Sequence, residues 1–381
     1  MEMENTKNYL SKQEVQILKG FAIIFMFIHH FFTFPEWHVE CIEYPYINAK
    51  VQYFREPFKI CVCIFAFLTG YTYFYVKDKC MRYSAKKISI FLLNYWMVYF
   101  LFEIIGVMTG CTQFEYIKFF KGCLGLDKSV MIFCWYVFFY VIMMLILPYL
   151  SVLLETNIFN AFLSGVIIPI IFLTVLRKFI PGEAFESMAW DISMFIPVIC
   201  VGYIHAKYDV FYTLYDALFQ KIQMKCFKII TYIVMIAVAI WGRYYCPYIV
   251  VGRISEEYAL NVNMDIFYAP MFIYACINLR RQINLKNSYI MSNLGKQSLL
   301  MWFISCIFFD ELKTIFQPVL YLPQNPILVL IWGTVLCYLF ALLLSLIITP
   351  LNNIVKKLFI KLNGFYEKKE ENCNERKVEN P

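Results

Sequence analysis

The pattern of hydrophobic and polar positions divides the chain into ten apolar runs separated by polar connections. A helix needs about 20 mainly apolar residues to cross a bilayer, and most of the runs are close to that length. The pattern therefore predicts an all-α integral membrane protein with about ten transmembrane helices. The expected spans lie at about 16–34, 57–76, 88–108, 130–150, 160–176, 190–205, 228–241, 262–279, 295–310 and 326–348.

Three of the runs, the sixth, seventh and ninth, are short. Pro197 interrupts the sixth run and Pro270 interrupts the eighth. A broken helix in a membrane usually borders a cavity, because its freed backbone groups need partners there. We therefore expect these segments to line an internal cavity.

Lysine and arginine concentrate in alternate connections, as in the stretch 77–87 between the second and third runs. Cytoplasmic loops of membrane proteins carry this excess of positive charge, so the N-terminus is expected inside. With an even number of spans, both termini are then cytoplasmic. We expect a cytoplasmic N-terminal segment 1–15, a ten-span membrane domain 16–350 and a charged cytoplasmic tail 351–381. The first run has no small-residue cleavage site after it and is expected to remain as a helix.

The composition supports a multi-pass protein of the cell membrane, plasma or inner. The chain is 61% hydrophobic and only 16% charged, whereas soluble domains carry about 25% charged residues. The net charge of +7 follows the lysines beside the membrane, and no basic patch on a soluble domain indicates a nucleic-acid partner. Most of the cysteines lie inside apolar runs as small hydrophobes. No spacing indicates a metal site.

Two adjacent histidines, His29 and His30, lie inside the first apolar run. An ionisable side chain in a bilayer costs at least about 2.5 kcal/mol, so it is retained mainly where it faces a cavity or a partner. Adjacent helical residues point about 100° apart, so one of the two is expected to be the principal functional group. Histidine is a natural general base because its unperturbed pKa is about 6.5.

Five sequence blocks occur in a recognisable order. Each is short, and they cover the chain from about residue 12 to 350. Together they resemble the acyltransferase-3 family of integral membrane acyltransferases, which modify polysaccharides, lipids and other acceptors, usually with acetyl groups. The blocks are Lys19-Gly20 with His30 ten residues after the glycine, Thr69-Gly70, Leu93-Asn94-Tyr95-Trp96, Phe133-Cys134-Trp135-Tyr136, and Leu294-Gly295-Lys296-Gln297-Ser298-Leu299-Leu300-Met301-Trp302-Phe303.

The chain departs from the family pattern at two places. Many members carry two arginines three residues apart before the third span, and these are linked to the acyl donor. Here Lys87 fills the first position and Ile90 fills the second. A lysine offers a point charge in place of the planar fork of arginine, which weakens the inference of a phosphate clamp. Ser305 stands where many members have a histidine.

The resemblance implies transfer of an acetyl group from cytoplasmic acetyl-CoA, as co-substrate, to a hydroxyl of a carbohydrate or glycolipid. His30 would accept the hydroxyl proton with His29 orienting it, or His30 would carry the acyl group as a nucleophile. The basic residues expected to hold the donor are Arg82, Lys86, Lys87, Arg280 and Lys296. The residues expected to meet the acceptor are Arg55, Glu56, Trp135, Tyr136, Ser298 and Ser305. For Arg55 and Glu56 the alternative is that the two pair with each other.

Two other interpretations remain open. A transporter or flippase for a glycolipid or oligosaccharide would explain a cavity and broken helices, and would need no donor site. A membrane sensor or assembly partner would explain the incomplete arginine pair and Ser305. The chain ends about thirty residues after the last run, so we expect no appended esterase-like domain. The acceptor, the acyl chain length and the oligomeric state leave no signature in the sequence.

Overall fold

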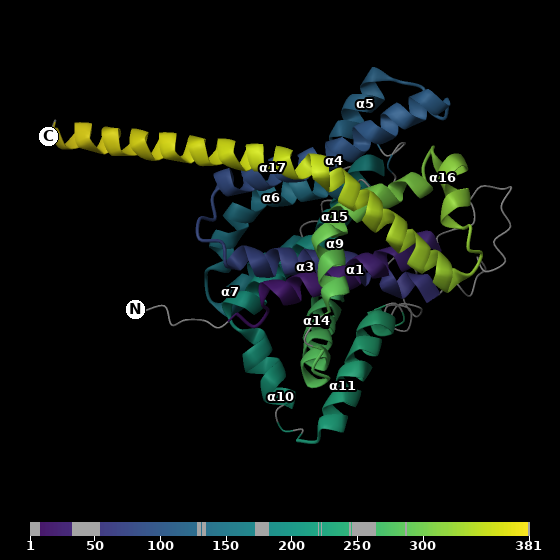
Figure 1. Cartoon of the computed structure of the whole chain (residues 1–381). Coiled ribbons are helices and arrows are strands. Elements are labelled where there is room, and N and C mark those ends of the chain that lie inside the picture. Colours follow the sequence, from purple (N-terminus) through teal and green to yellow (C-terminus); the bar gives the residue numbers. More distant parts are fainter. Residues whose placement is uncertain are drawn as a thin grey trace.

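The structure is a computed structural model that describes residues 8–32, 54–127, 131, 135–171, 183–219, 221, 223–243, 245, 264–285 and 288–379. Within these ranges the helices are joined by turns and short loops, and no strand is present. The helices form one bundle, and the C-terminal part of the last helix extends away from it (Figure 1). The helix bounds are α1 Lys12–Phe31, η2 Glu56–Lys59, α3 Ile60–Phe74, α4 Met81–Thr109, α5 Tyr116–Cys123, α6 Trp135–Leu154, α7 Ile158–Phe162, η4 Leu163–Ile167, α9 Glu183–Lys207, η5 Phe211–Asp216, α10 Ala217–Phe219, α11 Lys225–Ala237, η6 Val238–Gly242, α14 Asp265–Gln282, α15 Tyr289–Ser305, η7 Cys306–Phe308, α16 Lys313–Leu320 and α17 Pro326–Glu379.

Each of the ten predicted spans overlaps a helix of the structure. Among the described residues, six helices are long and apolar enough to cross a membrane, or up to seven if one bent pair counts as a span. The all-helical membrane fold is therefore confirmed. The count of about ten spans and the cytoplasmic position of both termini stay predictions.

Two helix pairs form the centre of the bundle, α1 with α15 and α3 with α9. Both pairs are built on reciprocal glycines. A Cβ on Gly20 would overlap the backbone carbonyl of Met291, and a Cβ on Gly295 would overlap that of Gln16. Small residues let membrane helices approach closely enough for backbone contact. The glycines therefore set the spacing of α1 and α15.

The pair α3 and α9 repeats this arrangement. A Cβ on Gly70 would overlap the carbonyl oxygen of Ile199, and a Cβ on Gly202 would overlap that of Phe67. In α3 the preceding residue, Thr69, faces an internal cavity. In α1 the residue before Gly20 is Lys19, which faces the same cavity. A polar residue followed by a glycine thus places a functional group on one helix face and a close helix contact on the next.

The expectation that prolines break the sixth and eighth runs is wrong. The helix α9 continues through Pro197, and α14 continues through Pro270. The break lies later, between Lys207 and Phe211, where the axis turns by 72°. At this break Asp209 has a φ of 48°, a left-handed conformation that ends a helix. A proline removes one hydrogen bond, and close packing of α9 against α3 keeps the helix continuous across it.

A separate polar network links the helices at each end of the bundle. At the N-terminal end of α1, Arg281 donates to Glu14 at 3.0 Å and to the Tyr9 carbonyl at 2.7 Å. At the other end, Arg243 binds both carboxylate oxygens of Asp265, at 2.6 and 3.0 Å. Cys63 donates to the same carboxylate at 3.0 Å. Buried charges need such pairing, because an unpaired charge in a low-dielectric interior costs several kcal/mol.

Candidate functional site

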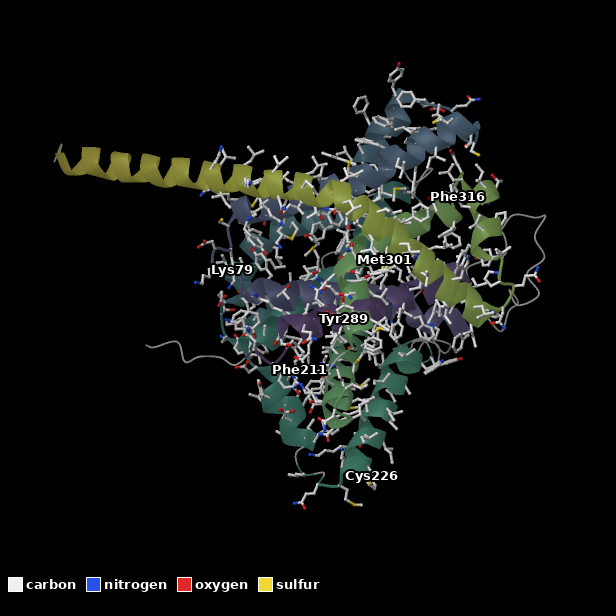
Figure 2. All side chains as sticks on the ribbon, viewed as in Figure 1. Lys79, Phe211, Cys226, Tyr289, Met301 and Phe316 are labelled. Carbon is white, nitrogen blue, oxygen red and sulfur yellow. The ribbon has the colours of Figure 1, made fainter. Side chains whose placement is uncertain are left out.

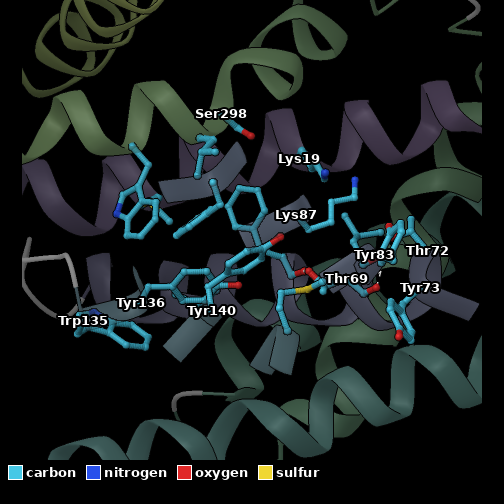
Figure 3. Close-up of a pocket in the computed structure, with 18 of the residues that line it drawn as sticks. Lys19, Thr69, Thr72, Tyr73, Tyr83, Lys87, Trp135, Tyr136, Tyr140 and Ser298 are labelled. Carbon is cyan, nitrogen blue, oxygen red and sulfur yellow. Dashed lines mark hydrogen bonds between the residues drawn. The ribbon is translucent and has the colours of Figure 1, made fainter. Parts of the chain in front are cut away.

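A cavity of about 270 Å³ lies among five helices, α1, α3, α4, α6 and α15. Figure 3 shows its lining, with Lys19 and Lys87 at one end and Trp135 and Tyr136 at the other. None of the cavity-lining residues that the structure describes is acidic. The lining residues are Lys19, Met26, His30, Val62, Phe65, Leu68, Thr69, Thr72, Tyr73, Tyr83, Lys87, Phe91, Trp135, Tyr136, Tyr140, Met144, Ser298, Leu299 and Trp302.

The helix α1 contributes both a cation and a histidine to the cavity. Lys19 and His30 are 11 residues apart, which is close to three full turns, so they lie on one face and about 16 Å apart along the axis. Met26 lies between them on the same face and also lines the cavity. The tight contact at Gly20 holds the neighbouring face of α1 against α15. The positions of Lys19 and His30 are therefore fixed by a rigid element.

The cationic end of the cavity is formed by Lys19 and Lys87, which come from α1 and α4. Their positive charges repel each other. The Lys87 ammonium lies 5.5 Å from the centre of the Tyr83 ring, within cation–π range. Since no described lining residue supplies a negative charge, this end is electrostatically suited to an anionic ligand.

The opposite end of the cavity is aromatic. Tyr136 packs edge to face against Trp302 with ring centres 5.4 Å apart, and Trp135 stacks on Phe195 at 5.6 Å. Aromatic faces of this kind offer apolar area with polar N–H and O–H groups at the edge. Between the two ends, Phe91 stacks on Tyr140 at 4.1 Å.

The structure brings five of the predicted site residues into this cavity: His30, Lys87, Trp135, Tyr136 and Ser298. The Ser298 hydroxyl donates to the carbonyl of Gly295 at 3.0 Å, one turn earlier in α15. These five residues come from four helices and span most of the chain length. The sequence therefore predicted these five residues of the lining, and the structure shows that they share one cavity.

Other predicted residues lie outside the cavity lining. His29 is adjacent to His30, with ring centres 5.5 Å apart, and does not line the cavity. Its carbonyl accepts a hydrogen bond from Arg55 at 3.3 Å, and Arg55 also pairs with Glu56 at 2.8 Å. The alternative that Arg55 and Glu56 pair with each other is thus the observed one. Ser305 is fully buried and donates to the Trp302 carbonyl at 2.7 Å.

The remaining basic candidates, on α4, α14 and α15, also lie outside the cavity lining. Arg82 and Lys86 lie on α4 but not on the face formed by Tyr83 and Lys87, so they do not line the cavity. Arg280 lies 3.5 Å from Glu14. Lys296 lines a separate groove at the start of α15 and donates to Asn293 at 3.3 Å.

The family model of the acyltransferase domain matches residues 12–349, nearly the whole chain. The chain belongs to the acyltransferase-3 family. No curated protein and no solved structure matches it. As an acyltransferase-3 protein, the chain is a membrane acyltransferase, and Lys19 and His30 of the first family block both line its cavity.

The main residue that sequence reasoning did not assign to the site of this acyltransferase-3 protein is Lys19. Its signal was available, because a lysine 11 positions before His30 must share its helix face. Thr69, Thr72 and Tyr140 also line the cavity, and no pattern within an apolar run distinguishes such residues from lipid-facing ones.

Proposed function

We propose that the protein transfers an acetyl or other short acyl group from cytoplasmic acyl-CoA to a hydroxyl of an extracytoplasmic carbohydrate or glycolipid. The reaction takes place in the cell membrane. The observation that carries the proposal is a single cavity without described acidic residues that holds two lysines at one end and His30 farther along. The family supports the acyltransferase class, and the cavity supports an anionic donor.

The spacing of Lys19 and His30 suits the donor. About twelve covalent bonds separate the phosphate oxygen of coenzyme A from its sulfur. An extended peptide of about four residues has the same number of backbone bonds and a length of about 14 Å, so the extended arm of coenzyme A has about that length. The separation of Lys19 and His30 along α1 is about 16 Å. A donor with its diphosphate on Lys19 and Lys87 thus brings its thioester close to His30.

The chemistry requires a base and a site for the developing oxyanion. His30 accepts the proton of the acceptor hydroxyl as the oxygen attacks the thioester carbonyl. The tetrahedral intermediate collapses, the carbon–sulfur bond breaks, and His30 returns the proton to the leaving thiolate. Hydroxyl donors of the lining, such as those of Tyr136 and Tyr140, are candidates to stabilise the oxyanion. Trp135, Tyr136 and Trp302 form a platform on which a sugar ring can stack.

A two-step route uses the same residues. His30 then attacks the thioester, holds the acyl group as an acyl-imidazole and passes it to the acceptor. Labelled acetyl-CoA without acceptor separates the two routes. Label that stays on the purified wild-type protein and is absent from His30→Ala supports the acyl-enzyme, and label that never attaches supports direct transfer.

The rival function is a glycolipid transporter with the same cavity. Acetyl-CoA binding to the detergent-purified protein, combined with label transfer to membrane glycolipid and polysaccharide, distinguishes the two. Binding with transfer supports the acyltransferase. A folded protein that binds no acetyl-CoA but moves glycolipid across vesicles would overturn the proposal.

A further inference from the structure

A second hollow lies at the N-terminal ends of α1 and α15, separate from the cavity. Its volume is about 540 Å³, and each of its lining residues carries a polar or charged group. Tyr289, 73% exposed, lies at its rim on the first turn of α15 (Figure 2). The groove is lined by Lys12, Gln13, Gln16, Tyr289, Ser292 and Lys296.

The charge in the groove is positive. Lys12 and Lys296 both line it, and none of its described lining residues is acidic. Glu14 is the nearest acidic residue in the sequence of α1, but it lies about 160° around the helix from Gln16. Glu14 is also held by Arg281 at 3.0 Å. The carboxylate of Glu14 therefore does not neutralise the two lysines in the groove.

The groove also contains a buried hydrogen-bond acceptor. The Oε1 atom of Gln16 is buried, and no described residue donates to it. A buried polar atom without a partner costs about 1–3 kcal/mol, so such atoms usually mark a place where a ligand or water binds. A ligand that satisfies Gln16 therefore carries an N–H or O–H donor as well as negative charge.

The groove and the cavity are aligned along α1. Lys12 is seven residues before Lys19, which is close to two turns, so both share one helix face about 10 Å apart. The cavity itself, at about 270 Å³, lies below the roughly 300–1,000 Å³ of pockets that hold whole drug-sized ligands. A long donor whose reactive arm fills the cavity must therefore place its other end outside it.

We infer that this groove binds the phosphorylated adenosine end of the acyl-CoA donor. The inference rests on the proposed function and extends it. The 3′-phosphate lies between Lys12 and Lys296, the adenine stacks on Tyr289, and its amino group donates to Gln16. An anionic lipid headgroup also carries a phosphate, but it has no aromatic ring that could stack on Tyr289. The donor then lies along one face of α1, with its nucleotide at Lys12, its diphosphate at Lys19 and its thioester at His30.

The test compares acetyl-CoA with acetyl-3′-dephospho-CoA on the full-length protein in detergent. Wild type is expected to bind acetyl-CoA about tenfold more tightly than acetyl-3′-dephospho-CoA, because a phosphate between two lysines makes charge-assisted hydrogen bonds. Lys12→Ala and Lys296→Ala are expected to lose that preference while keeping their affinity for the dephosphorylated donor. Lys357→Ala is the matched control, since Lys357 is exposed on α17 and lies in neither hollow.

The outcomes separate the groove from the function. If both donors bind wild type equally, or if the variants weaken both donors alike, the groove is not the nucleotide site and the proposed function stands. If the variants keep the preference but lose binding to phosphatidylglycerol nanodiscs relative to phosphatidylcholine nanodiscs, the groove is a lipid site and the inference is overturned. If folded wild type binds neither donor, the proposed function itself is overturned.

Discussion

Lys19 and His30 lie on one face of α1, three turns apart, and line the same cavity. Because a helix is rigid over this length, the separation of the two backbone positions along α1 is fixed before any ligand arrives. The packing of Gly20 and Gly295 fixes that face relative to α15. In the proposed function, Lys19 binds the charge of the donor and His30 is the place of its reaction.

The two cavity lysines are expected to set the affinity for the donor. Lys19→Ala and Lys87→Ala should each raise the KM for acetyl-CoA about tenfold or more, because each removes a charge-assisted hydrogen bond to phosphate worth about 1.5–3 kcal/mol. Initial rates over a range of acetyl-CoA concentrations measure this effect. Lys86→Ala is the control, since Lys86 is the adjacent lysine and does not line the cavity. An equal effect of Lys86→Ala would show that general positive charge, and not the cavity, attracts the donor.

Much of this site follows from the sequence. The resemblance and the spacing identify His30, and the positive charge before the third span identifies Lys87. Periodicity would also have distinguished Lys87 from its neighbours, because Tyr83, Lys87 and Phe91 recur every four residues on one face of α4. Arg280 could not be assigned in this way, because its partner Glu14 is 266 positions away and only tertiary packing brings the two together.

The glycine contact between α1 and α15 is expected to be intolerant of a methyl group. Gly20→Ala should lower the melting temperature by several degrees, since overpacking costs about 1–3 kcal/mol and the obstacle is the Met291 backbone. Thermal unfolding in detergent measures this. Gly242→Ala is the matched control, because its nearest neighbour would be Tyr268 at 3.4 Å, an ordinary contact. Equal melting temperatures for the two variants would contradict the account of the helix pair.

The ion pair of Arg243 and Asp265 is expected to stabilise the fold as a unit. Asp265 is 3% exposed and holds Arg243 through two hydrogen bonds. Removing either partner alone should cost about 3–5 kcal/mol, because the other charge stays buried without its partner. Asp265→Asn, Arg243→Met and the double variant form a cycle that unfolding measurements can close. A double variant that loses as much as the sum of the single variants would refute the coupling.

The stability of the protein is expected to depend on pH through Glu155, which lies just after α6. Burial would raise the pKa of the Glu155 carboxyl, but hydrogen bonds from Lys79 at 2.8 Å and from Tyr203 outweigh it and lower that pKa. An acid with a lowered pKa stabilises the fold above its unfolded pKa of about 4.3 and loses that contribution as the pH falls through its folded value. Glu155→Gln should therefore be less stable than wild type at pH 7, and the difference should vanish in strong acid.

Glu311 supplies a control of opposite sign. Burial and nearby acidic groups raise the pKa of the Glu311 carboxyl against the pull of Lys118. An acid with a raised pKa is penalised when ionised, so Glu311→Gln should be more stable than wild type at pH 7. Unfolding curves between about pH 7 and pH 3.5 test whether the two substitutions change the free energy of unfolding in opposite directions. Two shifts in the same direction would show that the electrostatic account of these carboxylates is wrong.

The sequence could not reveal how helices continue or bend. Pro197 looked like a break, yet α9 passes through it, and the 72° bend occurs beyond Lys207. The outcome depends on the packing of α9 against α3 through Gly202 and Gly70, which involves residues more than a hundred positions apart. Local propensity identifies a residue that weakens a helix, and tertiary contacts decide whether the helix ends there.

The most direct test of the central claim measures acetyl-CoA binding and acyl transfer together for wild type and His30→Gln. The account predicts that His30→Gln binds acetyl-CoA within about twofold of wild type, because the cavity lysines are intact. Its transfer rate should fall about 100-fold or more, the usual contribution of a general base. Transfer at the wild-type rate by folded His30→Gln would contradict the role assigned to this histidine.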